Sequence, residues 1–368
     1  MTIKRTSILK ARHESLGSNL EEWNEMGMPW TYDQDVNLEH QAIRTKACLF
    51  DLSGLKKIRV SGVDALAVCN DICTKNLTII YPGKSTYVLI LNENGGITDD
   101  AIMFHITPNC WMMVHGGGTG MEQLQKSAEN KDVTIEMDDD LHNLSLQGPS
   151  AVKLLDQHTP YDLKTLKYFH HAQTTLFGYH CMLSRTGYSG ERGYEIFAKA
   201  EHIVQLWDAI IEQGKSEGII PGSLTCIDMI RVEAGLFFYP YDMNENDTPW
   251  SIGLGFCVSK NKQTNYRGKA ACLAAKGKET TTTVGVIVDG DVAAEFEADV
   301  IVDKNRVGHV TGACYSTVMK ASICMARIDM KYSKSGQIIS IQSEGGNLTG
   351  TVSTMPLFDP EKGNRSAD

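Results

Sequence analysis

The clearest pattern of hydrophobic and polar positions lies on either side of Asn94-Gly95-Gly96. An apolar run at 87–91 precedes this tripeptide, and a second extended segment follows it up to residue 105. Because glycine adopts positive φ angles at little steric cost, the pattern predicts a β-hairpin. Asp99 and Asp100 are consecutive in its second strand, where side chains alternate between the two faces. We therefore expect one buried carboxylate, which is a candidate functional group; two solvated turn carboxylates are the alternative.

Periodic apolar positions predict further elements along the first three quarters of the chain. Helical spacing occurs at 38–50, 63–69, 121–128, 150–155, 200–213 and 223–234. Alternating or short apolar runs predict strands at 57–60, 111–114, 144–147 and 194–197. Helices and strands therefore share this part of the chain, which is typical of an α+β fold.

The character of the chain changes after about residue 275. Six short strands with turn residues between them follow, at 284–288, 300–302, 306–311, 322–327, 338–341 and 348–352. A run of strands with almost no helix predicts a small β-barrel or β-sandwich. We place the domain boundary within 275–282, so that the predicted domains are 1–278 and 279–368.

A glycine-rich segment, His115-Gly116-Gly117-Gly118-Thr119-Gly120, separates a predicted strand from the predicted helix at 121–128. It lacks the lysine of a P-loop and the spacing of a dinucleotide-binding motif. A turn with several unusual φ angles is the main interpretation. An anion site at the start of the helix is the alternative.

Composition limits the classes of partner. The 368 residues carry a formal net charge of −10, and no cluster of basic residues suggests nucleic-acid binding. No apolar stretch is long enough to predict a membrane span, so we expect a cytoplasmic protein that binds neither nucleic acid nor membrane. Most of the ten cysteines lie singly within apolar runs. This pattern predicts reduced core cysteines and no metal site.

Several strands bring carboxylates and aromatic residues toward one region. Asp99 or Asp100 and Glu195 supply the carboxylates, and the aromatic residues are Tyr87, Phe169, Tyr188 and Trp250. Such a set suits a flat heterocycle such as a pterin, since rings stack on its faces and a carboxylate accepts paired N–H donors. Ordinary core packing of the aromatic residues is the alternative.

Long motifs in a fixed order give the chain a resemblance to a known family. They are Leu49-Phe50-Asp51-Leu52-Ser53, Gly95-Gly96-Ile97-Thr98-Asp99-Asp100, Leu146-Gln147-Gly148-Pro149, Ser184-Arg185-Thr186-Gly187-Tyr188-Ser189-Gly190-Glu191, Gly193-Tyr194-Glu195-Ile196 and Arg231-Val232-Glu233-Ala234-Gly235. By these motifs the chain resembles the glycine-cleavage T-protein (aminomethyltransferase) family and its tetrahydrofolate-dependent demethylase relatives.

The resemblance implies a fold and a site. It implies a three-part cloverleaf, with two N-terminal α+β subdomains and a C-terminal β-barrel around a central folate site. It also implies that Asp100 is catalytic and that Glu195 holds the pterin of tetrahydrofolate. Tyr87, Tyr188, Asp99 and Phe169 are the further residues expected around the folate.

Two departures from the family pattern concern the donor side. T-proteins have an arginine where this chain has Ile227, and an Asn-Ala-X-Asn segment where it has His115-Gly116-Gly117-Gly118. These changes indicate a rebuilt donor pocket, for which we expect His115 and Trp250 to bind the substrate.

The predicted function is a tetrahydrofolate-dependent methyltransferase that demethylates a small methylated donor and forms 5-methyltetrahydrofolate. For such a donor, alignment and aromatic walls matter more than a strong acid or base. One alternative is the T-protein reaction, in which a lipoyl carrier protein supplies an aminomethyl group and methylene-tetrahydrofolate forms. The other is a folate-binding regulatory module without catalysis.

Overall fold

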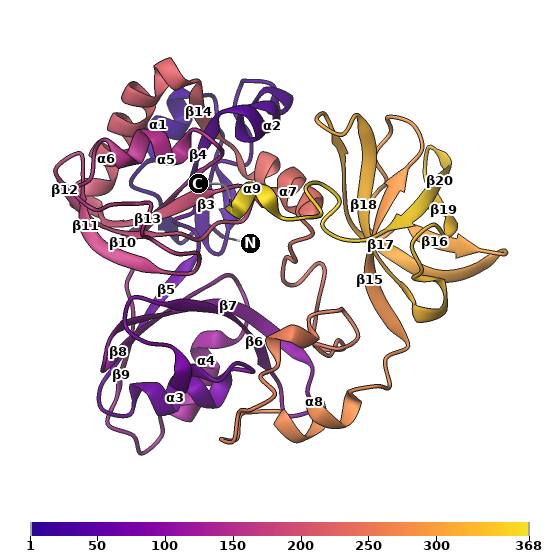
Figure 1. Ribbon diagram of the computed structural model, residues 1–368, viewed down its shortest axis with the longest axis horizontal. Helices are drawn as coiled ribbons and strands as arrows, with labels where there is room; N and C mark the ends of the chain where they lie inside the picture. Colours follow the sequence, from indigo (N-terminus) through magenta and orange to yellow (C-terminus); the bar gives the residue numbers. More distant parts are fainter. Residues whose placement is uncertain (1, 367–368) are drawn as a thin grey trace.

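The computed structural model describes residues 2–366, which form three lobes (Figure 1). The first lobe contains a six-stranded sheet with the strand order β11-β12-β13-β10-β4-β14 and a small sheet with the order β1-β3-β2. The strands are β1 (Arg5–Thr6), β2 (Glu21–Trp23), β3 (Met26–Met28), β4 (Ala47–Asp51), β10 (Leu141–Gln147), β11 (His171–Leu176), β12 (Tyr179–Ser184), β13 (Gly193–Lys199) and β14 (Ile219–Gly222).

Helices cover one face of the six-stranded sheet. Trp207 and Ile210 of α6 pack there against Leu144 and Ile196 in a buried core. The helices of this lobe are α1 (Lys10–Ser15), α2 (Val36–Thr45), α5 (Ala151–Asp156), α6 (Ala200–Gly214) and α7 (Leu224–Glu233). The opposite face of the sheet is left for other contacts.

The second lobe is a five-stranded sheet with the order β6-β7-β8-β5-β9, covered on one face by two helices. Its elements are β5 (Lys56–Ser61), α3 (Ala65–Ile72), β6 (Ser85–Leu91), β7 (Ile97–Thr107), β8 (Cys110–His115), α4 (Gly120–Ser127) and β9 (Thr134–Met137). The predicted hairpin is confirmed, since β6 pairs with β7 and Gly95 has φ +81°.

The uncovered faces of the two sheets pack together. Phe104, Met112 and Val114 of the second lobe form one buried cluster with Met182 and Phe197 of the first. This contact places β7 of one lobe close to β12 and β13 of the other. The central cavities described below lie along the same junction.

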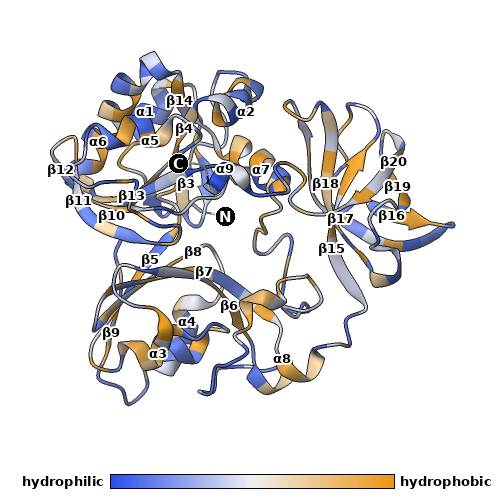
Figure 2. Ribbon diagram, in the orientation of Figure 1, coloured by the Kyte–Doolittle hydropathy of each residue, from blue (hydrophilic) through white to orange (hydrophobic). Residues whose placement is uncertain are grey.

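The third lobe is a closed barrel with the strand order β15-β18-β17-β16-β19-β20, and it confirms the six predicted strands. The strands are β15 (Thr281–Val288), β16 (Asp299–Val302), β17 (Asn305–Ser316), β18 (Ala321–Asp329), β19 (Ile338–Ser343) and β20 (Gly346–Ser353). Figure 2 shows hydrophobic and hydrophilic residues mixed along these strands, as expected where alternate residues face a barrel core. Helix α8 (Lys269–Ala275) precedes the barrel, and α9 (Gly363–Ser366) follows it.

A buried ionic cluster joins the barrel to the first lobe. Glu233 at the end of α7 accepts hydrogen bonds from His40 Nε2 at 2.7 Å and from Arg44 Nη2 at 2.6 Å, both on α2. Ser316 of the barrel donates to the same carboxylate at 2.5 Å. Arg44 also donates to the carbonyl of Ser189 at 2.8 Å. Arg44 therefore ties the loop that follows β12 to the same ionic cluster.

The predicted helix at 38–50 is wrong in its second half. Helix α2 ends at Thr45, and Ala47–Asp51 form β4, in which all five residues are buried. A strand that is buried on both faces has a continuous apolar run in its sequence. Such a run lacks the alternation of a half-buried strand, so the sequence pattern cannot distinguish it from a buried helix.

The glycine-rich segment also differs from its prediction. None of Gly116, Gly117, Gly118 and Gly120 has a positive φ angle. Gly118 and Gly120 are small for another reason, because a Cβ on Gly118 would lie 2.3 Å from Asp99 Cγ and one on Gly120 would lie 2.8 Å from Asp99 Oδ2. The anion at the start of α4 is the protein's own carboxylate, since Gly120 N donates to Asp99 Oδ2 at 2.8 Å.

Two further findings concern the chain as a whole. No helix within residues 2–366 is long and apolar enough to cross a membrane. All ten cysteines are unpaired and nine of them are buried, as their apolar surroundings predicted.

Candidate functional site

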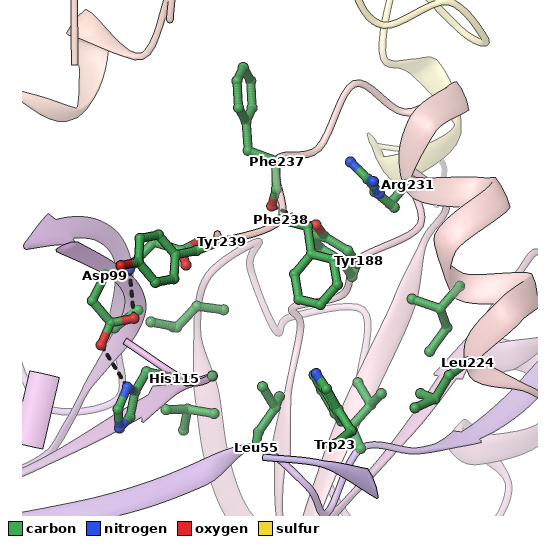
Figure 3. A pocket seen from close by; sticks show the side chains of 18 of the residues that line it. Trp23, Leu55, Asp99, His115, Tyr188, Leu224, Arg231, Phe237, Phe238 and Tyr239 are labelled. Carbon is green, nitrogen blue, oxygen red and sulfur yellow. Dashed lines mark hydrogen bonds and ion pairs between the residues drawn. The ribbon is translucent and has the colours of Figure 1, made fainter. Parts of the chain in front are cut away.

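A cavity of about 190 Å³ lies where the first two lobes and the end of α7 meet. Four carboxylates line it, and we name it the carboxylate cavity after them: Asp99, Asp100, Glu195 and Asp228. Figure 3 shows Trp23, Tyr188 and Phe238 around its open centre. Acidic groups therefore lie in a largely hydrophobic enclosure, where burial changes their protonation.

Asp99 and Asp100 face opposite sides of β7, as the alternation predicted. Asp99 is fully buried, and its carboxylate accepts hydrogen bonds from His115 Nδ1 at 2.7 Å and Gly120 N at 2.8 Å. The backbone N–H of Asp100 donates to Asp99 Oδ1 at 2.9 Å. With three donors, Asp99 holds the glycine-rich segment against the strand. Only His115 Nδ1 is engaged in this contact, which Figure 3 shows as a dashed line, whereas His115 Nε2 is buried without a hydrogen-bond partner among residues 2–366.

Asp100 is the more available of the two carboxyl groups. It is partly buried, and its Oδ2 accepts a hydrogen bond from Tyr87 Oη at 2.9 Å. Burial, together with the neighbouring charge of Asp99, raises the pKa of Asp100 to about 7. A carboxyl group that titrates near neutral pH can both accept and donate a proton under ordinary conditions.

Glu195 approaches the cavity from the facing sheet. It is 5% exposed, and the hydroxyl of Thr186 donates to its Oε2. Burial raises its pKa above the ordinary value. On the neighbouring strand Ser145 pairs with Glu195 and Asn143 with Phe197, so Asn143 lies on the same face of the sheet. Among residues 2–366 the buried amide of Asn143 forms no hydrogen bond of good geometry, yet it lies close enough to Glu195 to oppose the effect of burial on the pKa of that carboxyl group. Glu195 and Asn143 together offer polar atoms to a ligand.

Two tyrosines flank these carboxylates. Tyr188 Oη donates to the carbonyl of Phe237 at 2.5 Å, and Tyr87 Oη is held by Asp100. Burial raises the pKa of both phenols, so they remain neutral donors. Both side chains also line a second, larger cavity, and they therefore mark the passage between the two.

The predicted site residues are only partly brought together. Asp99, Asp100, Glu195, Tyr87, Tyr188 and His115 line the carboxylate cavity, whereas Phe169 lines the second cavity. Trp250 lines neither of them, so the cavity geometry gives no support to its predicted role in binding the donor. Its indole Nε1 donates to the carbonyl of Cys272 at 2.7 Å, so it packs against the segment before the barrel.

The sequence reasoning missed much of the aromatic wall. Trp23, Trp30, Phe238 and Tyr239 line the cavity, and none of them was predicted to do so. They come from the small sheet near the N-terminus and from the loop after α7. The signal available was local composition, because 21–32 and 236–241 are both unusually rich in aromatic residues.

Near Ile227, where the family pattern has an arginine, the structure places a different cation. Ile227 lines the cavity where the family pattern has an arginine, and the nearby cation is Arg231, one turn further along α7. Arg231 Nε contacts Asp228 at 2.8 Å, and its Nη1 pairs with the buried Asp242. The remaining guanidinium is therefore neutralised by the chain's own carboxylates.

Two α+β lobes and a closed barrel around a cavity with paired carboxylates define an aminomethyltransferase-like protein. Family models agree with this class: the GCVT N-terminal domain matches residues 9–262 and the glycine cleavage T-protein C-terminal barrel domain matches residues 282–359. The chain belongs to the glycine-cleavage T-protein family.

Three relatives illustrate the range of this family. The chain is 44% identical to the heme-dependent oxidative N-demethylase gamma subunit of Ectopseudomonas mendocina, over 99% of this chain and 98% of that protein. It is 31% identical to an aminomethyltransferase of Streptomyces coelicolor, over 97% and 98% of the two chains. The structure of the glycine cleavage system aminomethyltransferase T of Bartonella henselae matches with a TM-score of 0.88 and 25% identity, over 97% of this chain and 98% of that one.

Proposed function

We propose that this protein transfers a one-carbon unit, released by oxidative demethylation of an amine, to tetrahydrofolate. Family membership supports the transfer, and the name of the demethylase gamma subunit supports the source of the carbon. The observation that carries the proposal is the pairing of Asp100 and Glu195, which reach one enclosed cavity from two different sheets. One carboxyl group would then serve the chemistry and the other the binding of folate.

The residues around Glu195 fit a pterin. The pterin edge presents adjacent N–H donors, and a carboxylate accepts such a pair side by side. The amide of Asn143, next to Glu195, offers a further donor and acceptor on the same face of the sheet. Tyr188, held by Phe237, supplies an aromatic surface next to them. Glu195 and Asn143 can therefore bind the polar edge of the pterin, and Tyr188 can pack against its flat face.

The oxidation level of the carbon follows from the chemistry of the donor. Oxidative N-demethylation removes two electrons from an N–CH₃ group, and these are taken by the oxidase, so the carbon leaves at the level of formaldehyde. Condensation of this carbon with N5 and N10 of tetrahydrofolate gives methylene-tetrahydrofolate and water without further electron transfer. This product differs from the 5-methyltetrahydrofolate predicted from the sequence.

Asp100 suits such a condensation. Two N–H protons are lost and one hydroxyl leaves as water, so a group that alternates between acid and base is needed. The pKa of Asp100 is about 7, and Tyr87 fixes its orientation by a hydrogen bond. We assign Asp100 as the residue that moves these protons.

Methyl transfer to give 5-methyltetrahydrofolate is the second candidate. It is favoured by the aromatic wall of Trp23, Trp30, Phe238 and Tyr239, because aromatic faces attract methylated cations. The two candidates require different donors. Formaldehyde or a carbinolamine serves the first, and a methylated ammonium or sulfonium compound serves the second.

The test is the folate product formed by purified protein. Tetrahydrofolate is incubated with formaldehyde, with a panel of methylated ammonium and sulfonium compounds, or with an aminomethylated lipoyl carrier, and products are identified by mass spectrometry. We expect methylene-tetrahydrofolate from formaldehyde, at a rate above the spontaneous condensation and reduced in Asp100→Asn. 5-Methyltetrahydrofolate from an onium compound would favour the second candidate. Product from the lipoyl carrier alone, or folate binding without any turnover, would contradict both.

A further inference from the structure

Four aromatic rings form a chain of contacts from the carboxylate cavity to the surface of the protein. Trp23 packs edge-on against Phe238, with 6.5 Å between the ring centroids, and Phe238 contacts Tyr241 at 5.2 Å. Tyr241 in turn contacts Phe296, in the loop between β15 and β16 of the barrel, at 5.5 Å. The two inner rings, Trp23 and Phe238, line the carboxylate cavity, where Figure 3 shows both of them. The rings therefore connect the cavity with the barrel.

The two outer rings are open to solvent. Tyr241 is 49% exposed and Phe296 is 51% exposed, and Val292 of the same barrel loop is 59% exposed. Packing of the barrel loop against the segment after α7 accounts for the contact between the rings, but it leaves about half of each side chain uncovered. Neighbouring exposed aromatic side chains are typical of the centre of a protein–protein interface. This part of the surface is therefore a candidate docking site.

The two segments that carry the outer rings are acidic. The barrel loop 289–297 contains Asp289, Asp291, Glu295 and Glu297, all of them exposed. Neither this loop nor the segment 236–247 contains a lysine, arginine or histidine. Within residues 2–366 none of the four loop carboxylates forms an ion pair. We name the two outer rings and these four carboxylates the acidic aromatic patch.

The charge of the acidic aromatic patch decides which kind of occupant it fits. A second copy of this chain in a two-fold contact would place the same carboxylates opposite each other, and like charges repel across an interface. A protein with basic residues around an apolar centre would cover the rings and also neutralise the carboxylates. The patch therefore fits a basic partner of a different kind rather than a second copy.

The position of the patch connects such a partner to the one-carbon chemistry. Phe238 lies between Tyr241 and the cavity that Asp100 lines. Asp228 lines the same cavity and its side chain is 48% exposed, so solvent reaches the cavity beside α7. A protein seated on Tyr241 and Phe296 would therefore lie within two ring contacts of the carboxylate cavity.

We propose that the acidic aromatic patch docks the amine-oxidising enzyme that supplies the one-carbon unit, through a basic face of that enzyme with an apolar centre. This inference rests on the proposed function, since that function requires a separate oxidase. Tyr241 and Phe296 form the centre of the interface, and the four loop carboxylates form its rim. Docking there brings the oxidase next to the carboxylate cavity, so the released carbon travels only a short way to Asp100.

The experiment measures the binding of this protein to a demethylase. The probe is the heme-dependent oxidative N-demethylase of Ectopseudomonas mendocina, prepared without its gamma subunit. Biolayer interferometry gives the Kd and the association rate constant. We expect the Kd to rise with added salt, because screening weakens the attraction between an acidic and a basic face. Phe296→Ala should raise the Kd about tenfold, because a few central aromatic residues carry most of the binding energy of an interface.

A charge variant and two controls assign the binding to the patch. Asp289→Lys combined with Asp291→Lys changes the rim without touching the rings, and it should lower the association rate constant about tenfold at low salt. Ile338→Ala truncates a side chain of β19 that is 56% exposed, and Glu129→Lys reverses an exposed charge in the second lobe. Both controls should bind like the wild-type protein.

The same variants separate docking from catalysis. None of the substituted residues lines the carboxylate cavity, so each variant should form methylene-tetrahydrofolate from free formaldehyde at the wild-type rate. No binding of the demethylase by a wild-type protein that makes this product would overturn the docking site and leave the proposed function intact. Binding at the patch without any folate product would support the docking site and overturn the proposed transfer.

Three further outcomes would overturn the docking site. The first is binding that neither patch variant weakens, or that the two controls weaken equally. The second is a Kd that does not change with salt, since the partner would then not be basic. The third is a dimer of this protein alone, detected by sedimentation, that Phe296→Ala dissociates, because the patch would then serve a second copy. The charge variant keeps the test decisive if Phe296→Ala fails to fold.

Discussion

The carboxylate cavity and the larger cavity beside it differ in charge. They share Tyr87, Tyr188 and Phe237, yet the first is lined by four carboxylates, whereas the lining of the second includes four cations and no aspartate or glutamate. We name the second the cationic cavity after Lys75, Lys84, Lys362 and Arg365. The comparison teaches that the fold keeps groups of opposite charge apart in adjoining cavities, although the chain as a whole is acidic.

The cavities also differ in how their charges are held. In the carboxylate cavity Asp99 is fixed by three donors and Glu195 by Thr186, so these groups are rigid parts of the two sheets. In the cationic cavity the lysines are bound at most to a carbonyl or an aromatic face. Rigid groups suit chemistry that depends on alignment.

The largest effect is expected from Asp100→Asn, which removes the titrating group from the carboxylate cavity. General acid–base residues contribute about 10²–10⁴-fold to rate, so kcat for one-carbon transfer should fall by that order. Folate affinity should change little, because Glu195 remains. Steady-state kinetics and calorimetry measure the two quantities. A loss of affinity with unchanged kcat would assign Asp100 to binding.

The pH dependence of the wild-type protein and of Asp100→Asn tests the same role of Asp100. If transfer needs the ionised form of Asp100, kcat/KM of the wild-type protein rises with pH through about 7, and this inflection is absent in Asp100→Asn. The folding stability changes with pH in the opposite direction to kcat/KM. Because the pKa is raised on folding, stability is greatest below the ordinary aspartate pKa of about 4 and is lost as pH rises through about 7. Asp100→Asn should therefore melt at a higher temperature than the wild type at pH 8 and at a similar temperature near pH 4.

The next largest effect is expected from Glu195→Gln, which weakens the proposed contact with the pterin in the carboxylate cavity. Hydrogen bonds to a charged acceptor are worth about 1.5–3 kcal/mol, so folate Kd should rise by roughly 10–100-fold. Calorimetry with 5-formyl-tetrahydrofolate provides the test. An unchanged Kd would contradict the assignment of Glu195 to the pterin.

A smaller effect is expected from Gly118→Ala, which places a methyl group against Asp99 in the wall of the carboxylate cavity. A Cβ here would lie 2.3 Å from Asp99 Cγ, so Asp99 or the glycine-rich segment must move. We expect a loss of about 1–3 kcal/mol in the free energy of unfolding and a reduced kcat. Denaturant unfolding measures the first quantity. Gly345→Ala is the matched control, because a Cβ there meets no atom within 4 Å. Equal stability of the two variants would contradict the packing explanation.

The smallest effect is expected from Trp250→Phe, which belongs to neither cavity. The change removes the hydrogen bond to the carbonyl of Cys272 and should cost about 1 kcal/mol of stability. The KM for the one-carbon donor should stay the same. A selective rise in that KM would restore the sequence-based prediction that Trp250 binds the donor.

These comparisons indicate what could be predicted from the sequence. The hairpin, the alternation of Asp99 and Asp100, and the barrel strands follow from local patterns, and the structure has each of them. The resemblance supplied Asp100 and Glu195, because long motifs fix their positions in the chain. The boundary between α2 and β4 within residues 38–50 could not be predicted, because β4 is buried on both faces and its sequence lacks alternation.

Other features depend on contacts between distant residues. Gly118 and Gly120 are explained by the approach of Asp99, which local sequence does not reveal. The cationic cavity combines residues near 80 with residues near 365, and no local pattern connects them. The contact of Trp250 with Cys272 is likewise set by the packing of the segment before the barrel. Charge and aromatic composition indicate such residues, but only the fold brings them together.

The central claim is that folate accepts the one-carbon unit at the level of formaldehyde. The most direct test uses a trideuteromethyl amine, tetrahydrofolate, this protein and a heme-dependent oxidative N-demethylase that lacks its own gamma subunit. We predict labelled methylene-tetrahydrofolate that retains two deuterium atoms and forms more slowly with Asp100→Asn. A 5-methyl product that retains all three deuterium atoms, or a folate pool without deuterium, would contradict the claim.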